Sequence, residues 1–126
     1  DLYSSLAQIL LTEGVARAIR QSLAKTVYVC NLATKYGETN NFSVKDFASE
    51  IEKYLGGPLD YVLYNSFVPP SSRIKRYLKS HPELISLVEI NGDLPPEKFL
   101  GANLFLKSGP LEHDSKKLAK TIIDLV

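Results

Sequence analysis

Apolar residues along the first quarter of the chain change their spacing, and the change predicts two kinds of element. Between residues 1 and 24 apolar side chains recur at helical intervals, which predicts two short helices. Gly14 interrupts the pattern, so we expect a bend at Thr12–Gly14 between them. Residues 26–32, TVYVCNL, are a continuous apolar run without alternation, which is typical of a strand covered on both faces in a parallel sheet.

An amphipathic helix is predicted to begin after Ser43. The Ser43 hydroxyl can accept a hydrogen bond from a free backbone N–H, and Asp46, three residues on, completes a pair that resembles a capping box. The sequence Gly56-Gly57-Pro58 ends the helix. Its apolar stripe comprises Val44, Phe47, Ile51, Tyr54 and Leu55.

The second half continues the alternation. LDYVLYN (59–65) predicts a second strand, a helix follows from about Ser72 to Lys79, and ELISLVEI (83–90) predicts a third strand. Residues 91–110 are mostly loop, with NLFLK as a short fourth strand or an edge segment, and Asp114 caps a last helix whose Leu118, Ile122 and Leu125 face inward. This order predicts an α/β sandwich with a mainly parallel sheet, as one domain over residues 1–126.

Composition narrows the class of protein. The chain is 44% hydrophobic and 23% charged, with 15 Lys and Arg against 14 Asp and Glu, which gives no basic excess of the kind that nucleic-acid binders carry. No apolar run approaches the roughly 20 residues needed to cross a membrane. The single cysteine, Cys30, excludes a disulfide within the chain, and we expect a cytoplasmic protein.

Polar residues follow the predicted strands at the point where each one ends. Asn31, Asn65 and Asn91 occupy these positions, and the carboxyl ends of parallel strands form one rim, where ligands bind. The loop TKYGET adds Thr34, Gly37, Glu38 and Thr39, whose hydroxyl and backbone N–H groups suit phosphate oxygens. Asparagine is also common at turns, and the loop has no P-loop pattern, so a purely structural explanation stays open.

The helix after VPPSS carries a basic cluster. Arg73, Arg76 and Tyr77 lie within about one turn and could hold a phosphate while the ring stacks on a base; a solvated helical face explains the same residues. His81 and His113 lack metal-ligand spacing, so no metal site is predicted, and Cys30 fits a small core residue. No nucleophile–base arrangement is evident, so the catalytic residues, if any, are unknown.

Three stretches resemble the CofD-like family, in particular its YvcK, or gluconeogenesis factor, branch. DLYSSL is similar to the family helix start G-P-G-[SD]-L-Y-[TS]-S. KTVYVCNLATKYGETNNFSVKDF is similar to V-Y-[VI]-x-N-L-M-T-x-x-G-E-T-x-x-F-[ST]-x-x-D. LDYVLYNSFVPPSSRIKRY resembles D-x-V-L-x-N with a later R-Y or K-Y. The likeness covers nearly the whole chain.

The resemblance implies a three-layer Rossmann-like fold and a regulatory protein that binds a nucleotide or UDP-sugar, linked to carbon metabolism and cell-wall synthesis. The CofD branch implies the alternative, a 2-phospho-L-lactate transferase-type enzyme that uses Mg²⁺, with Asp1 as an acidic candidate. The motif match assigns ligand-binding roles to these residues: Asn31, Thr34, Gly37, Glu38, Thr39, Asn65 and Tyr77. A plain interaction module without a ligand is the third reading.

The chain departs from the family pattern in two ways. Where YvcK-type members often carry arginine before the last helix, this chain has Glu112, which is unfavourable for a phosphate unless the side chain turns away. Residue 1 falls just after the family's Gly-Pro-Gly, and no methionine is present, so we expect the chain to be the C-terminal part of a larger CofD-like fold. A half sheet has an unpaired edge, which predicts pairing with its own N-terminal half or with a second copy.

Overall fold

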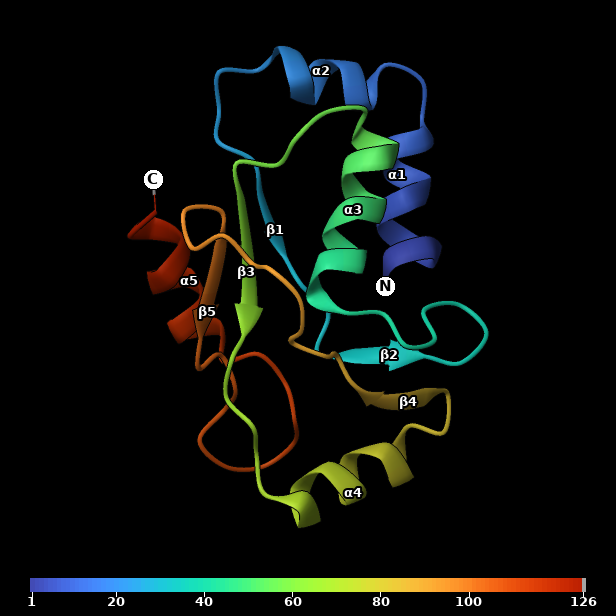
Figure 1. Ribbon diagram of the computed structural model, residues 1–126, viewed down its shortest axis with the longest axis vertical. Helices are drawn as coiled ribbons and strands as arrows, with labels where there is room; N and C mark the ends of the chain where they lie inside the picture. Colours follow the sequence, from blue (N-terminus) through green and yellow to red (C-terminus); the bar gives the residue numbers. More distant parts are fainter. Residues whose placement is uncertain (126) are drawn as a thin grey trace.

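The computed structural model describes residues 1–125 and alternates helices with strands (Figure 1). In chain order the elements are the π-helical turn η1 (Leu2–Leu6), α1 (Ala7–Leu11), α2 (Val15–Gln21), β1 (Val27–Val29), β2 (Ala33–Lys35), α3 (Val44–Leu55), β3 (Tyr61–Asn65), α4 (Ser71–Ser80), β4 (Leu84–Leu87), β5 (Phe99–Ala102) and α5 (Ser115–Ile123). The two short N-terminal helices are separated at Gly14, whose φ of 83° lies in the left-handed region that glycine adopts without strain.

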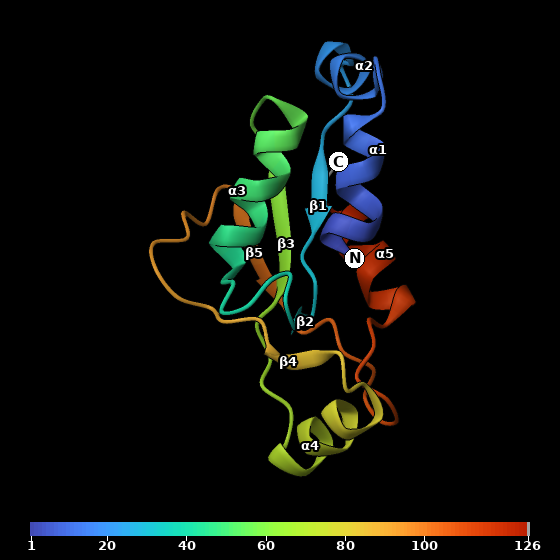
Figure 2. The same ribbon diagram turned by 90° about the vertical axis from the view of Figure 1, so that its right-hand side faces the viewer.

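A three-stranded parallel sheet in the order β1-β3-β5 forms the centre of the fold. Helix α3 covers one side with α1 beside it, and α5 lies on the opposite side (Figure 1); Figure 2 shows the side that carries α3 and α1. The predicted α/β class with a parallel sheet is therefore confirmed. Because β1 and β3 run in the same direction, Asn31 and Asn65 lie at the same end of the sheet.

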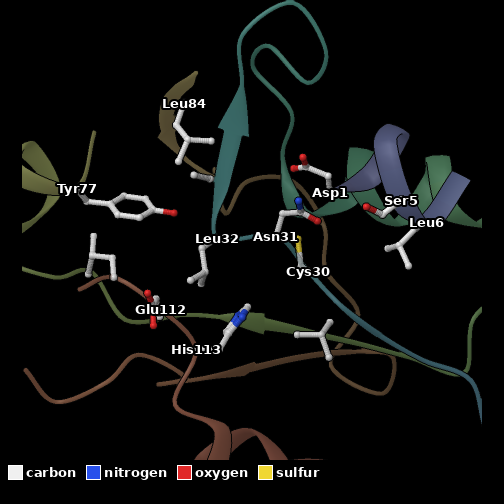
Figure 3. A pocket seen from close by; sticks show the side chains of 13 residues that line it. Asp1, Ser5, Leu6, Cys30, Asn31, Leu32, Tyr77, Leu84, Glu112 and His113 are labelled. Atoms are coloured by element: carbon white, nitrogen blue, oxygen red, sulfur yellow. The ribbon is translucent and has the colours of Figure 1, made fainter. Parts of the chain in front are cut away.

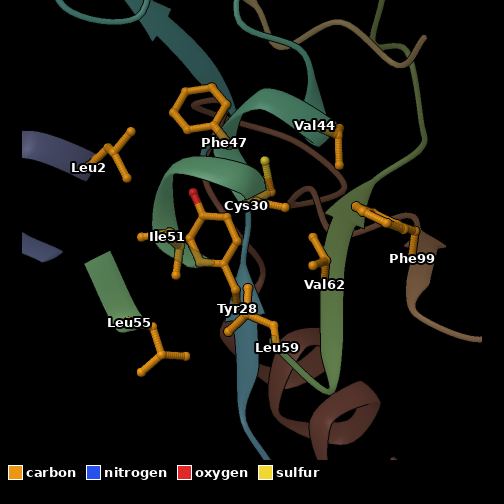
Figure 4. Packing of buried hydrophobic residues seen from close by; sticks show 11 residues of the cluster. Leu2, Tyr28, Cys30, Val44, Phe47, Ile51, Leu55, Leu59, Val62 and Phe99 are labelled. Carbon is orange, nitrogen blue, oxygen red and sulfur yellow. The ribbon is translucent and has the colours of Figure 1, made fainter. Parts of the chain in front are cut away.

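The hydrophobic core lies between the sheet and α3. Tyr28, Val62 and Phe99 follow one another across the three strands and face Phe47 of the helix (Figure 4). Phe47 and Val62 are fully buried, with 0% of their surface exposed. Burial of such side chains stabilises a fold by about 1.5–3 kcal/mol each, so this layer holds the strand ends in place.

Helix α3 begins and ends where the sequence predicts. The Ser43 hydroxyl accepts from the Asp46 backbone N–H, and the Asp46 carboxylate accepts in return from the Ser43 backbone N–H at 2.8 Å, so the capping box is confirmed. Gly56 ends the helix with a φ of 70°, a left-handed conformation. Asp114 caps α5 by accepting from the N–H groups of Lys116 and Lys117, also as predicted.

The third predicted strand is not part of the parallel sheet. Its residues Leu84–Leu87 form β4, which pairs antiparallel with β2 in a separate two-stranded sheet. Asn91 therefore does not share a rim with Asn31 and Asn65. The third parallel strand is instead Phe99–Ala102, just before the segment predicted as strand or edge. An apolar run shows that a segment is extended but not which strand it pairs with. The predicted place of this strand in the parallel sheet was therefore wrong.

Two further features of the strands were not predicted from the sequence. Residues 33–35, predicted as the start of a loop, form the short strand β2. In β5, Gly101 lies against the Tyr64 ring, and a Cβ atom there would be 2.8 Å from the Tyr64 hydroxyl, so a larger residue would force the Tyr64 side chain to shift. Among residues 1–125 no helix combines the length and the apolar character needed to cross a membrane.

Candidate functional site

A cavity of about 510 Å³ opens at the carboxyl end of β1. Its walls come from four parts of the chain: the N-terminal turn, the residues that follow β1, the α4–β4 region, and the segment before α5 (Figure 3). The lining residues are Asp1, Ser5, Leu6, Val29, Cys30, Asn31, Leu32, Ala33, Tyr77, Leu84, Leu111, Glu112 and His113. The size suits a small-molecule ligand, for which 300–1,000 Å³ is usual.

Asn31 lies in the wall of this cavity, directly behind the first parallel strand. Its side-chain oxygen accepts from the Tyr28 hydroxyl at 3.0 Å, which fixes the amide and leaves its N–H groups as donors. Burial raises the pKa of Tyr28 far above its usual range, so this hydroxyl keeps its proton and donates at neutral pH. Asn31 is thus a preorganised donor at the strand end.

Tyr77 extends from α4 on the other side of the cavity, with its hydroxyl directed toward the middle (Figure 3). Its ring lies 4.6 Å from the ring of His81, centroid to centroid, and tilted by 44°. Burial raises the pKa of the Tyr77 phenol, and the carboxylates of Glu83 and Glu112 raise it further. A neutral phenol in a cavity wall can contact a ligand ring and donate a hydrogen bond.

Glu112 and His113 form the wall next to α5 (Figure 3). His113 Nε2 is buried and has no hydrogen-bond partner within residues 1–125. Burial lowers the pKa of this imidazole, which favours its neutral form. Neither residue was predicted from the sequence as part of the site. No local signal marks them, because their place in the wall depends on the path of the loop before α5.

The loop residues predicted to bind phosphate make contacts within the protein. Thr34 is buried, and its hydroxyl bonds with Ser86, while the buried Thr39 hydroxyl accepts from the Lys35 backbone N–H at 2.8 Å. The Gly37 N–H donates to Asn40 at 2.7 Å, and Glu38 pairs with Lys35 at 2.9 Å. Thr34, Gly37, Glu38 and Thr39 are not among the cavity-lining residues, so their predicted ligand contacts remain predictions.

Asn65 lies at the same end of the sheet as Asn31 but lines a separate cavity of about 210 Å³, which Asn31 also borders. The Asn65 amide donates to the Phe67 carbonyl at 2.7 Å, and its oxygen accepts from the Leu104 N–H at 3.1 Å. Both ends of the side chain thus stabilise the turn after β3. Its role in ligand binding is still a prediction.

The two arginines of α4 have different surroundings. Arg73 donates to three backbone carbonyls, those of Gly109, Leu106 and Pro110, at 2.8–3.0 Å. Arg76 is exposed and lines a hollow of about 310 Å³ on the far side of Tyr77. The structure therefore brings Arg76 close to the cavity wall, whereas the guanidinium of Arg73 holds the loop before Leu111.

The residues present do not form a site for Mg²⁺. The two carboxylates that line the cavity, Asp1 and Glu112, stand on opposite sides (Figure 3), and Asp1 pairs with Lys35 at 3.2 Å. In the described part of the chain no three His, Cys, Asp or Glu side chains gather where they could hold a metal. Burial raises the pKa of the Cys30 thiol to about 12, so it stays protonated at neutral pH and is a core residue rather than a nucleophile.

Comparison with known proteins gives one consistent result. The family described as "2-phospho-L-lactate transferase CofD" matches residues 1–121. A Thermotoga maritima protein named "Putative gluconeogenesis factor" is 37% identical over 97% of this chain, and the Bacillus subtilis "Gluconeogenesis factor" is 27% identical over 100% of this chain. A crystal structure of a Bacillus halodurans protein superposes with a TM-score of 0.83 at 26% identity, covering 98% of this chain. The chain spans 40% of the length of each of these three proteins.

Proposed function

Since the chain belongs to the CofD family, we propose that it is a binding and regulatory protein of the gluconeogenesis-factor type that recognises a UDP-sugar or a related nucleotide. Residues 1–126 correspond in this proposal to the C-terminal part of a CofD-like nucleotide-binding domain. The names of the relatives support a link to carbon metabolism, and a role in cell-wall synthesis and a cytoplasmic location belong to the same proposal.

The cavity at the carboxyl end of β1 is the observation that carries this proposal. Open parallel sheets bind their ligands beyond the carboxyl ends of the strands, and here this place is hollow. The Asn31 amide and the Tyr77 ring line it from opposite sides, and both were predicted as ligand contacts from the sequence. A fixed donor on one wall and an aromatic face on the other suit a nucleoside, which has a polar edge and a flat apolar face.

A transferase of the 2-phospho-L-lactate type is the second candidate, because the matching family carries that description. In this alternative the enzyme acts on a phosphate-linked substrate and requires Mg²⁺. The described residues do not supply the metal ligands themselves, so those ligands would have to come from elsewhere. The regulator is preferred because the curated relatives carry the name gluconeogenesis factor.

Binding and product analysis separate the two functions. The chain is titrated with UDP-glucose in a calorimeter and, in parallel, incubated with guanosine-linked phospholactate, a deazaflavin acceptor and Mg²⁺, followed by mass spectrometry. Saturable binding of UDP-glucose without product supports the regulator. Transfer of a phospholactyl group overturns it, and absence of any UDP-sugar binding overturns it as well.

The free edge of β1 supports a further part of the proposal. Within residues 1–125 β1 pairs only with β3, so its outer edge is open there, and beside it lies an apolar groove of about 260 Å³ that includes Leu6, Ile9 and Leu10. An unpaired edge beside apolar side chains favours association. Because most of the length of the relatives lies outside the matched region, we propose that a segment of the same family fold covers this edge. A monomer in light scattering of the isolated chain fits this proposal, whereas a dimer favours a second copy.

A further inference from the structure

Carboxylates line the cavity on one side of Tyr77, and arginines line the hollow on its other side. We propose that this separation of charge positions the nucleoside and the phosphates of a nucleoside diphosphate. In this arrangement the uncharged nucleoside lies in the cavity, where Glu112 accepts hydrogen bonds from the ribose hydroxyls. The phosphates pass over Tyr77 into the neighbouring hollow and meet Arg76. The inference rests on the proposed function, because it assumes a nucleotide ligand, and it specifies how that ligand is oriented.

The cavity itself is unsuited to phosphate. Its ionisable lining residues are Asp1, Glu112 and His113, without a lysine or arginine among them. Asp1 is paired with Lys35, but within residues 1–125 Glu112 forms no ion pair. A phosphate beside an unpaired carboxylate is repelled, so the anionic part of a ligand would avoid this wall.

The same wall is well suited to hydroxyl groups. An ionised carboxylate only accepts hydrogen bonds, and its two oxygens can accept from two neighbouring hydroxyls of a ribose at once. An acidic residue that accepts from the ribose 2′-hydroxyl is a recurring solution in nucleotide-binding folds. Next to Glu112, the buried Nε2 of His113 is without a partner in the described residues, and in either tautomer it offers one more hydrogen bond.

The hollow beyond Tyr77 has the opposite character. Its volume is about 310 Å³, and its ionisable lining residues are Arg73, Arg76, Tyr77 and His81, without a carboxylate. Arg73 is engaged with backbone carbonyls, whereas the described residues provide no hydrogen-bond partner or ion pair for the guanidinium of Arg76. An unpaired guanidinium is a strong partner for phosphate oxygens.

Tyr77 connects the two spaces. It lines both the cavity and the hollow, as does Leu111, so a ligand that crosses from one to the other passes these side chains. The hydroxyl of Tyr77 points into the cavity (Figure 3). The distribution of charge therefore gives the ligand a direction: nucleoside toward Glu112, phosphates toward Arg76.

The test compares UDP with 2′-deoxyuridine diphosphate, which lacks one ribose hydroxyl. Dissociation constants of both are measured by calorimetry for the wild-type chain, Glu112→Gln and Arg76→Gln. Exposed neighbours provide matched controls, Glu97→Gln for the carboxylate and Lys75→Gln for the arginine, because neither residue lines the cavity or the hollow. Circular dichroism spectra establish that each variant is folded.

We expect the wild-type chain to bind UDP about tenfold more tightly than the deoxy compound, since a hydrogen bond to a charged group contributes about that factor. Glu112→Gln should reduce this preference to about twofold or less, and it should weaken UDP more than the deoxy compound, which keeps only its 3′-hydroxyl as a partner for the carboxylate. Arg76→Gln should weaken both ligands by about tenfold and leave their ratio unchanged. The two controls should bind as the wild type does.

An unchanged preference for UDP in Glu112→Gln, or an unchanged affinity in Arg76→Gln, overturns the inference. If UDP-glucose binds saturably while these patterns are absent, only the orientation is wrong and the proposed function stands. If neither UDP nor UDP-glucose binds the wild-type chain, the proposed function and the orientation fall together.

Discussion

Replacing Arg73 by alanine should destabilise the fold rather than remove a direct ligand contact. The guanidinium of Arg73 joins α4 to the loop that leads into Leu111, through hydrogen bonds to the carbonyls of Leu106, Gly109 and Pro110. The loop has no helix or strand of its own between β5 and α5. Its position, and hence that of the cavity wall that follows it, depends on this side chain.

The size of the effect follows from the three hydrogen bonds. A hydrogen bond from a charged donor contributes about 1.5–3 kcal/mol when buried, and a neutral one about 1 kcal/mol. Two of the three bonds of Arg73 are exposed to solvent and one is partly buried. We therefore take the low end and expect Arg73→Ala to lower the free energy of unfolding by about 2 kcal/mol. Arg73→Lys can keep one of the bonds and should lose about half as much.

Urea unfolding followed by far-ultraviolet circular dichroism measures this free energy; the chain has no tryptophan to report by fluorescence. For a chain of this size the same loss corresponds to a fall in Tm of about 6–10 °C. Arg76→Ala is the control on the same helix. Arg76 is exposed, and within residues 1–125 its guanidinium makes no hydrogen bond to the loop, so the unfolding free energy of Arg76→Ala should stay within about 0.5 kcal/mol of the wild type.

Two results would refute the reasoning. The first is an unfolding free energy for Arg73→Ala equal to that of the wild type. The second is a loss of UDP-glucose binding in Arg73→Lys with no loss of stability, since that pattern identifies a phosphate contact. The sequence predicted the latter role, and the experiment decides between the two.

Three other predictions follow from particular contacts. Tyr77→Ala should weaken binding of UDP-glucose by about 1–3 kcal/mol if its ring stacks on the base, and an unchanged affinity in calorimetry removes Tyr77 from the site. Ser43→Ala should lower the unfolding free energy by about 1 kcal/mol through loss of the cap, while Ser49→Ala, exposed in the middle of the same helix, should not destabilise. The hydrogen bonds from Thr26 hold the pKa of Asp60 at about 2, below its usual 3.8, so its stabilisation is present above pH 4 and is lost as pH falls toward 2. Urea unfolding of Asp60→Asn should accordingly differ from the wild type at pH 6 and converge with it near pH 2.

Local chemistry made parts of the fold predictable. Ser43, Asp46 and Gly56 bound α3 because caps and left-handed glycines act within one helical turn, and that information is contained in neighbouring residues. Strand pairing is different. The apolar run 83–90 gives no sign that its central residues pair with Ala33–Lys35 rather than joining the parallel sheet. The partner of a strand depends on residues far away in the chain, and a single sequence does not specify it.

The candidate site was likewise predicted only in part from the sequence. Asn31 and Tyr77 were predicted as ligand contacts, and the structure places both on one cavity. Glu112 and His113 join them only through the path of the loop before α5, which no local pattern revealed. Conversely, Thr34 carries a side chain typical of a phosphate site, but burial against Ser86 directs its hydroxyl into the protein. Residue type indicated the chemistry, and tertiary packing determined where it was available.

The cavity has walls from residues near both ends of the chain, from Asp1 to His113. No short fragment of the sequence contains all of these walls, so a ligand of this cavity would bind the folded chain and not the unfolded one. Occupancy must then shift the folding equilibrium, by about 2.7 kcal/mol at a ligand concentration one hundred times the dissociation constant. Melting temperature is therefore a screening signal, and compounds can be ranked on this protein by the increase that each one causes.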